Sequence, residues 1–174
     1  MRILGRIQDK NFAAKARYDY FMSKGHRNAP MMEKALAEIP VLIKMPEYSK
    51  DVTWSKGEIL RWLGRHDEAI KAYQAANRQP QSTWMVAECQ IALKQFGAAI
   101  KTVQGLESVG GSTAAQACFK IADIHRVSGD KGKEVQQLRL VLRRYPKSGE
   151  SSTAHDRLES YGVKVTGGEA VAEE

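Results

Sequence analysis

The chain has 174 residues, of which 43% are hydrophobic and 27% are charged. These proportions match an ordinary globular domain and exclude a wholly disordered chain. The formal net charge of +7 favours encounters with nucleic acid, anionic surfaces or acidic proteins. No stretch approaches the roughly 20 consecutive apolar residues that span a bilayer, and the sequence shows no signal-peptide core near Met1.

Cysteine usage bears on the compartment. Cys89 and Cys118 are the only two cysteines, and one pair cannot staple a chain of this length. We therefore expect a reducing compartment, the cytoplasm. The alternative that the chain is a fragment of an exported protein stays open.

The chain repeats itself, which is the first sign of its architecture. Thr53-Trp54 recurs as Thr83-Trp84, and Ala69-Ile70 recurs as Ala99-Ile100, both after 30 residues. Two independent pairs displaced by the same interval indicate a tandem repeat. Helical spacing of apolar residues, with Gly64 as a closing residue, predicts that each repeat is a pair of helices.

In chain order, the predicted helices cover residues 13–23, 30–44, 54–63, 67–76, 83–94, 97–106, 113–128, 131–144 and 151–161, with a further turn or two within 1–10. Pro40 is expected to kink or break the second of them. No segment alternates at period two, so we expect no sheet. The predicted units are 11–46, 50–80, 81–110 and 113–148, followed by a cap over 150–162. One domain would cover 1–163, and the acidic segment 164–174 would form a disordered tail.

Residues 63–76 resemble the tetratricopeptide repeat (TPR), in which a glycine closes the first helix and an Ala-x3-aromatic-x2-Ala face packs the second. The resemblance extends over 11–148, with departures at Tyr18, Pro30 and Glu134, the last standing where the family prefers alanine. It implies an all-α fold, a right-handed α-solenoid of antiparallel helix pairs with a C-terminal capping helix, of the bacterial type. The last pair is similar to TPR domains of bacterial envelope-associated proteins, which normally carry an export signal that this sequence lacks.

The resemblance also implies that the first helix of each pair lines a concave groove. Alignment on the closing glycines places aromatic residues one turn before carboxylates on one helix face. Aromatic rings offer cation–π surface, so a basic or apolar peptide is the expected ligand. The predicted groove residues are Trp54, Glu58, Arg61, Trp84, Glu88, Phe119, Asp123 and Arg126.

An alternative register remains open for this groove. A shift of one residue would turn Trp54 and Trp84 inward, where they would pack between helices. Gly57 and Ala87 would then lose their role as the small residues at a close helix crossing, which favours the groove register.

The sequence predicts a non-catalytic scaffold that binds a partner polypeptide in this groove. It contains no H-E-x-x-H, C-x-x-C or phosphate-binding loop and no arranged nucleophile, so we expect no enzyme, cofactor or metal site. Cys118 and His125 could share a helix face, but a buried cysteine and a surface histidine is the favoured interpretation.

Two other functions stay open. The chain could be a self-assembling structural subunit, or it could bind nucleic acid or an anionic surface through basic residues of the last helix pair. The same residues are interspersed with leucines, which is typical of the solvated side of an amphipathic helix. The basic patch consists of Lys131, Lys133, Arg139, Arg143 and Arg144.

Overall fold

The computed structural model describes residues 10–24 and 28–165. Within these residues the chain forms only helices and no strand, which confirms the all-helical prediction. Predictions for residues 1–9, Gly25 and the tail residues 166–174 lie outside the described residues. The elements are α1 (Lys10–Lys24), α2 (Ala29–Leu42), α3 (Pro46–Trp62), α4 (His66–Ala76), α5 (Gln81–Ala92), α6 (Phe96–Gln104), the 3-10 helix η2 (Gly105–Val109), α7 (Gly111–Val127), α8 (Lys131–Arg144) and α9 (Gly149–Ser160).

Capping side chains and a proline mark where several helices begin. Asn28, Asp130 and Ser148 cap α2, α8 and α9, and each side-chain oxygen accepts the backbone N–H three residues on, at 3.3, 3.0 and 3.1 Å. These bonds satisfy N–H groups that have no partner inside the helix. Pro46 opens α3, where its missing N–H costs nothing, so this helix starts earlier than the predicted unit boundary at residue 50.

One kind of turn ends four of the helices. Beyond α3, α5, α7 and α9, a backbone N–H bonds to the carbonyl oxygen five residues earlier, which closes a Schellman motif. The residue before the donor is left-handed: Gly64 (φ 75°), Gly129 (φ 82°), Gly162 (φ 73°) and, in α5's turn, Lys94 (φ 59°). The recurrence of one turn at these places supports the predicted helical repeat. The bonds join Arg65 to Leu60, Gln95 to Gln90, Asp130 to His125 and Val163 to Leu158, at 2.8–3.0 Å.

Pro40 lies inside α2 without breaking it. The helix continues to Leu42, and the N–H of Ile43 still bonds to the carbonyl of Ile39 at 2.9 Å. Because Pro40 stands two residues before the helix end, its missing N–H removes only one late hydrogen bond. Of the two outcomes expected at this proline, the break does not occur.

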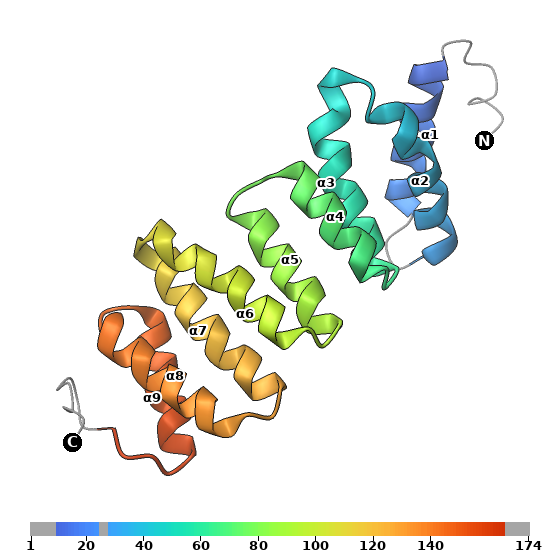
Figure 1. Ribbon diagram of the computed structural model, residues 1–174. Helices are drawn as coiled ribbons and strands as arrows, with labels where there is room; N and C mark the ends of the chain where they lie inside the picture. Colours follow the sequence, from blue (N-terminus) through green and yellow to red (C-terminus); the bar gives the residue numbers. More distant parts are fainter. Residues whose placement is uncertain (1–9, 25–27, 166–174) are drawn as a thin grey trace. The chain divides into compact units, whose positions relative to one another are not determined.

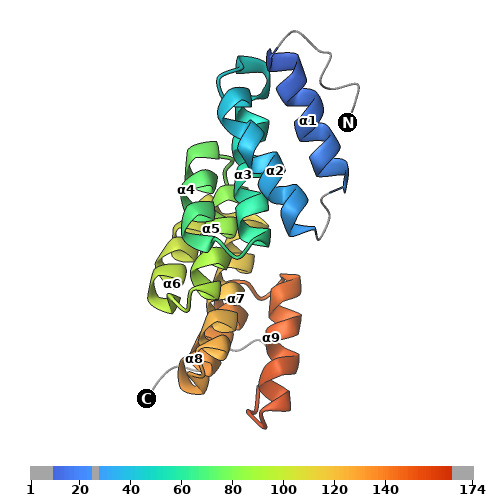
Figure 2. The same cartoon turned by 90° about the vertical axis from the view of Figure 1, so that its right-hand side faces the viewer.

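The chain divides into two compact units, residues 1–89 and 90–174, with the boundary inside α5. In unit 1, α1 lies against α2 and α3 lies against α4 (Figures 1 and 2). In unit 2, α8 lies against both α7 and α9. Helices adjacent in sequence therefore pack as hairpins within each unit.

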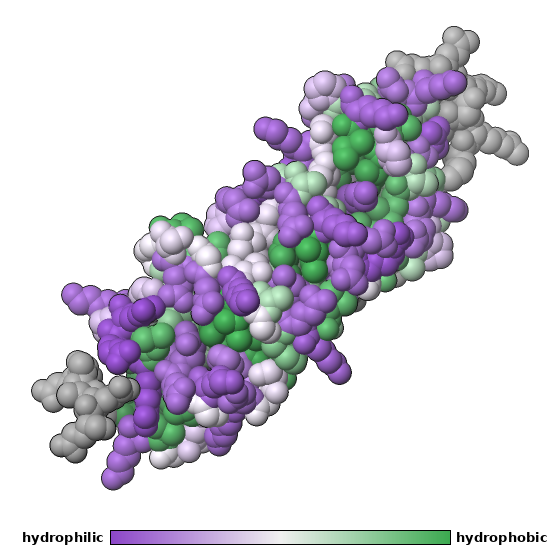
Figure 3. Space-filling view, viewed as in Figure 1, coloured by the Kyte–Doolittle hydropathy of each residue, from purple (hydrophilic) through white to green (hydrophobic). Residues whose placement is uncertain are grey.

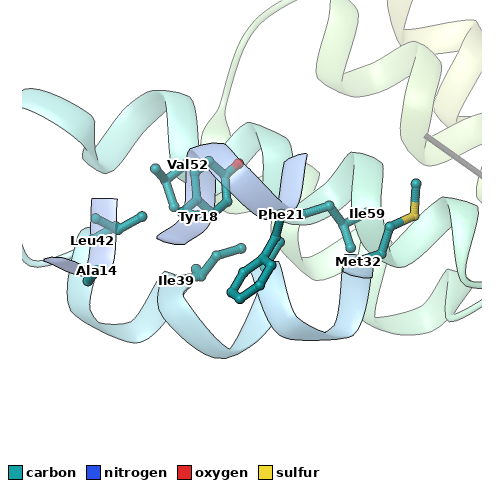
Figure 4. Packing of buried hydrophobic residues seen from close by; sticks show 9 residues of the cluster. Ala14, Tyr18, Phe21, Met32, Ile39, Leu42, Val52 and Ile59 are labelled. Atoms are coloured by element: carbon teal, nitrogen blue, oxygen red, sulfur yellow. The ribbon is translucent and has the colours of Figure 1, made fainter. Parts of the chain in front are cut away.

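The first core of unit 1 forms where α1, α2 and α3 meet (Figure 4). Tyr18, which departs from the small residue expected there, is buried in this core. The aliphatic positions of α2 recur at helical spacing and face the same cluster. The buried residues are Ala14, Tyr18, Phe21, Met32, Ala35, Ile39, Leu42, Val52 and Ile59.

The second core of unit 1 joins α3, α4 and α5. Tyr73 is fully buried there, and its ring lies so close to α3 that a Cβ at Gly57 would be 2.7 Å from Tyr73 Cε1. Gly57 is therefore the small residue at the crossing of α3 and α4, and Trp54, which is partly buried, also packs against this core. The buried residues are Leu60, Ala69, Ala72, Tyr73, Val86 and Cys89.

The core of unit 2 is formed by α7, α8 and α9. Val163 and Val165, which follow α9, pack against it, so packing continues past the residue 164 at which the predicted tail begins. Leu158 and Ala154 anchor α9 in this core and are fully buried. The buried residues are Cys118, Ala122, Leu138, Val141, Ala154 and Leu158.

No helix within residues 10–24 or 28–165 is both long and apolar enough to cross a membrane. The face shown in Figure 3 is mostly hydrophilic, with small hydrophobic areas between polar side chains. Scattered exposed apolar side chains are ordinary for a folded chain. In the described residues the large ones are Phe12, Tyr20, Val41, Ile43, Trp62, Val109 and Val127.

Candidate functional site

The predicted groove residues of unit 1 lie on α3 and α5. Trp54, Glu58 and Arg61 follow one another along α3, and Trp84 and Glu88 stand one turn apart on α5. All five are half-buried. Residues spaced by three or four share a helix face, so each helix presents its predicted residues on one side.

Tyr73 of α4 engages the two charged groups of α3. Its hydroxyl donates to Glu58 Oε1, and Arg61 Nε donates to the Tyr73 oxygen at 3.3 Å. Arg61 Nη2 also lies 3.4 Å from Glu58 Oε2. Burial, together with the hydrogen bond to Glu58, raises the pKa of Tyr73, so the phenol stays neutral. The Glu58 carboxylate therefore positions Tyr73 inside the unit and has its charge paired with Arg61.

Trp54 is covered by an arginine of the same chain. Its ring packs edge-on against Tyr73, with centroids 5.1 Å apart. The guanidinium carbon of Arg78 lies 5.4 Å from the Trp54 ring centroid, and Arg78 Nη2 pairs with Asp51, three residues before Trp54 on α3. An aromatic ring, a carboxylate and a guanidinium thus meet at the surface of α3. We expected a partner to bring a basic group to the Trp54 ring, and here Arg78 of the same chain supplies it.

The predicted residues of unit 2 also hold an arginine. Arg157 of α9 places its guanidinium carbon 4.7 Å from the ring centroid of Phe119. Its Nη1 lies 2.7 Å from Asp123 Oδ1. Arg126 is exposed and lies 3.6 Å from the same carboxylate oxygen, so two cations share Asp123.

Glu134 completes this second arrangement as a buried carboxylate. It is 2% exposed, and its Oε1 accepts a hydrogen bond from the Tyr161 hydroxyl at 3.0 Å. Arg157 Nη1 lies 3.5 Å from the same oxygen. A buried charge is tolerated only when it is paired and hydrogen-bonded. These partners explain how a glutamate occupies a position where the TPR family prefers alanine.

Known proteins resemble this chain at the level of fold. No protein-family model matches the chain, and no curated protein matches it. The crystal structure of MamA protein, a TPR-like helical protein, aligns with a TM-score of 0.53 and 12% identity, over 92% of this chain and 100% of that chain. The helical fold fits the TPR type. An identity this low shows the fold alone, and these comparisons indicate no catalytic family.

Sequence reasoning missed the arginines and the tyrosine that engage the predicted groove residues and Glu134. Arg157 pairs with Asp123 across 34 positions of sequence, and Tyr161 reaches Glu134 across 27. No local spacing signals such contacts. The Asp51–Trp54 spacing of three was visible, but Arg78 comes from the loop after α4 and nothing in the sequence aims it at that ring.

The predicted basic patch lies on α8, where contacts divide its five residues. Lys133 pairs with Asp130 at 2.8 Å, and Arg144 pairs with Glu107 at 2.9 Å. Lys131 lies 4.6 Å from the Tyr161 ring centroid. Arg139 and Arg143 are exposed and make no ion pair within the described part of the chain. These two arginines are one turn apart and face the same side of the helix.

An open pocket of about 410 Å³ lies beside this helix in unit 2. The ion pair between Arg144 and Glu107 forms part of its wall, so Arg144 belongs to the pocket rather than to the surface of Arg139 and Arg143. Buried Ile121 and half-buried Leu140 supply its apolar part. The lining residues are Gln104, Glu107, Ile121, Gln137, Leu140 and Arg144.

The cysteine and histidine considered as a metal pair lie in different surroundings. Cys118 is fully buried, its sulfur accepts a hydrogen bond from Gln137 at 3.2 Å, and burial raises its pKa to about 11. His125 is half-buried, and burial lowers its pKa. On α9, the ligand atoms of His155, Asp156 and Glu159 lie within 4.8 Å of one another at a largely exposed surface. Exposed groups of this kind are common without an ion.

Proposed function

We propose that this chain is a non-catalytic scaffold that binds a partner polypeptide along the first helices of its TPR-type hairpins. The binding residues in unit 1 are on α3 and α5, and those in unit 2 are on α7. We further propose that the hairpins stack as a right-handed α-solenoid and that the chain works in the bacterial cytoplasm. The two buried free thiols, Cys89 and Cys118, support a reducing compartment.

One observation supports the proposal above the others. Two aromatic rings predicted for the groove already hold guanidinium groups, Arg78 on Trp54 and Arg157 on Phe119. Rings and carboxylates that accept an arginine from within the chain have the right chemistry for a polypeptide with basic and apolar residues. Trp84 adds a half-buried tryptophan, which is the residue type most enriched among energetically important interface positions.

The test is a pull-down with the full chain as bait. Trp84→Ala is expected to abolish capture of the partner while helical content and melting temperature stay nearly unchanged. Trp62→Ala is the matched control, because Trp62 is a tryptophan outside the predicted groove and is 49% exposed. Capture that survives Trp84→Ala would refute the proposed face, and unfolding of that variant would show that Trp84 belongs to the core.

A second function has a specific observation in its favour. Arg139 and Arg143 form a pair on α8 that no carboxylate among the described residues neutralises, which suits a phosphate-bearing polymer or surface. Filter binding of nucleic acid over a salt series tests it. Two phosphate contacts predict a log–log slope of about −2 that disappears in an Arg139→Ala/Arg143→Ala variant. A flat salt dependence would remove this candidate.

A further inference from the structure

The two arginines that cover aromatic rings are held very differently. Arg157 is 15% exposed and stands on α9 directly before fully buried Leu158, so its backbone is fixed by the core of unit 2. Arg78 is 39% exposed and lies in the loop after α4, directly after Asn77, the left-handed residue that caps the end of α4. Arg157 is held by largely buried partners, whereas Arg78 is more exposed and can leave its site by rotating its own side chain.

The contacts of Arg78 are also of the exchangeable kind. Its carboxylate partner, Asp51, is 80% exposed, and ion pairs between exposed groups contribute little to stability. The same holds for a cation–π contact that remains open to water. In the arrangement of unit 2, by contrast, Asp123 is 25% exposed and Glu134 is 2% exposed. An arginine thus contacts an aromatic ring and a carboxylate in both units, in a largely buried arrangement at Phe119 and in an open, solvent-exposed arrangement at Trp54.

The open arrangement favours arginine over lysine. A planar guanidinium can stack on the Trp54 ring while its fork of N–H groups meets the Asp51 carboxylate. An ammonium is a compact, strongly hydrated charge and cannot make both contacts as well. The other nearby carboxylate, Glu58, is engaged by Tyr73 and Arg61, so Asp51 is the acceptor that an incoming cation would meet.

We propose that Trp54 and Asp51 form an arginine-binding site for the partner polypeptide, which Arg78 occupies in the free chain and yields on binding. This inference rests on the proposed function and deepens it, because it names the side chain that the partner presents and the internal competitor. Arg157 takes no part in this exchange, since its partners Asp123 and Glu134 are less exposed than Asp51.

An internal competitor reduces the apparent affinity to the intrinsic affinity multiplied by the fraction of time for which the site is open. If Arg78 covers Trp54 about four-fifths of the time, its removal tightens binding about fivefold. The probe is N-acetylarginine amide, titrated into the full chain. Two-dimensional NMR follows the indole N–H of Trp54, which is assigned with Trp54→Phe.

We expect Arg78→Ala to bind this probe about fivefold more tightly than the wild-type chain. Lys71→Ala, which removes the same charge from an exposed position of α4, should leave the affinity unchanged. N-acetyllysine amide should bind the Arg78→Ala chain more weakly than the arginine probe does. Asp51→Asn added to Arg78→Ala should reverse the gain.

Equal affinity of the Arg78→Ala and wild-type chains would overturn the proposal, as would equal binding of the two amides. Arg78→Gln, which keeps a long polar side chain without the charge, repeats the test if Arg78→Ala lowers helical content. The titration needs no captured partner. If the chain binds the arginine probe but captures no partner in the pull-down, the arginine site stands and the proposed function is refuted. If the pull-down succeeds but the probe does not bind as expected, only the arginine site is refuted.

Discussion

Replacement of Gly57 by alanine places a methyl group where the Tyr73 ring already lies. The added Cβ would be 2.7 Å from Cε1, 2.8 Å from Cδ1 and 3.0 Å from Cζ of that ring. Carbon atoms pack at about 3.5–4.0 Å, so the ring or α3 must move by about 0.8 Å. Tyr73 cannot simply turn away, because it is fully buried and its hydroxyl is held by Glu58 and Arg61. Overpacking costs about 1–3 kcal/mol, and alanine regains about 0.5–1 kcal/mol over glycine in a helix. The expected net destabilisation of Gly57→Ala is about 0–2.5 kcal/mol.

Urea unfolding followed by far-UV circular dichroism measures this effect. In a Tyr73→Leu background the methyl group has room, so Gly57→Ala should be neutral or stabilise the chain by up to about 1 kcal/mol. Gly97→Ala is the control, since a Cβ at this position of α6 would meet nothing within 4 Å. If Gly57→Ala stabilises the otherwise wild-type chain, α3 and α4 do not approach each other as described.

Three further results are expected. Lys94→Gly should raise the free energy of unfolding by about 1 kcal/mol, because Lys94 holds the left-handed conformation that Gly64 supplies in the equivalent turn; an unchanged value would contradict this. Burial lowers the pKa of His125, so below about pH 6.5 the unfolded chain binds more protons than the folded chain, and the free energy of unfolding decreases as the pH decreases. His125→Gln should flatten this decrease, measured as urea midpoints over a pH series, and an unaltered pH dependence would exclude His125 as its source. Burial raises the pKa of Cys89 and Cys118 to about 11 each, so a thiol reagent at about pH 8 should label both only after denaturation, and rapid labelling of the folded chain would contradict their burial.

The features set by local rules could be predicted from the sequence. Gly64 and Gly129 end helices because a left-handed residue closes the Schellman turn, and both do so in the structure. Ala69 and Tyr73 are spaced to face one side of a helix, and both are fully buried. The break that was one of two outcomes expected at Pro40 does not occur, because the helix ends only two residues later, which the sequence did not show.

The electrostatic state of the predicted face could not be read from the sequence. The three-residue spacing of Glu58 and Arg61 indicates that they pair, as they do, but it gives no sign that Tyr73, 15 residues on, also engages Glu58 through the hairpin. Arg78 and Arg157 reach their aromatic partners through a loop and a later helix. Such contacts depend on how hairpins pack, which no spacing within a single helix records.

The affinity of the chain for its captured partner tests the central claim most directly, when it is measured for the wild-type chain, Trp84→Ala and Trp62→Ala under one set of conditions. The account predicts that Trp84→Ala weakens binding at least about tenfold, about 1.4 kcal/mol, with its melting temperature nearly unchanged. Trp62→Ala should bind as the wild-type chain does. Equal affinities for all three chains would show that the first-helix face does not bind the partner.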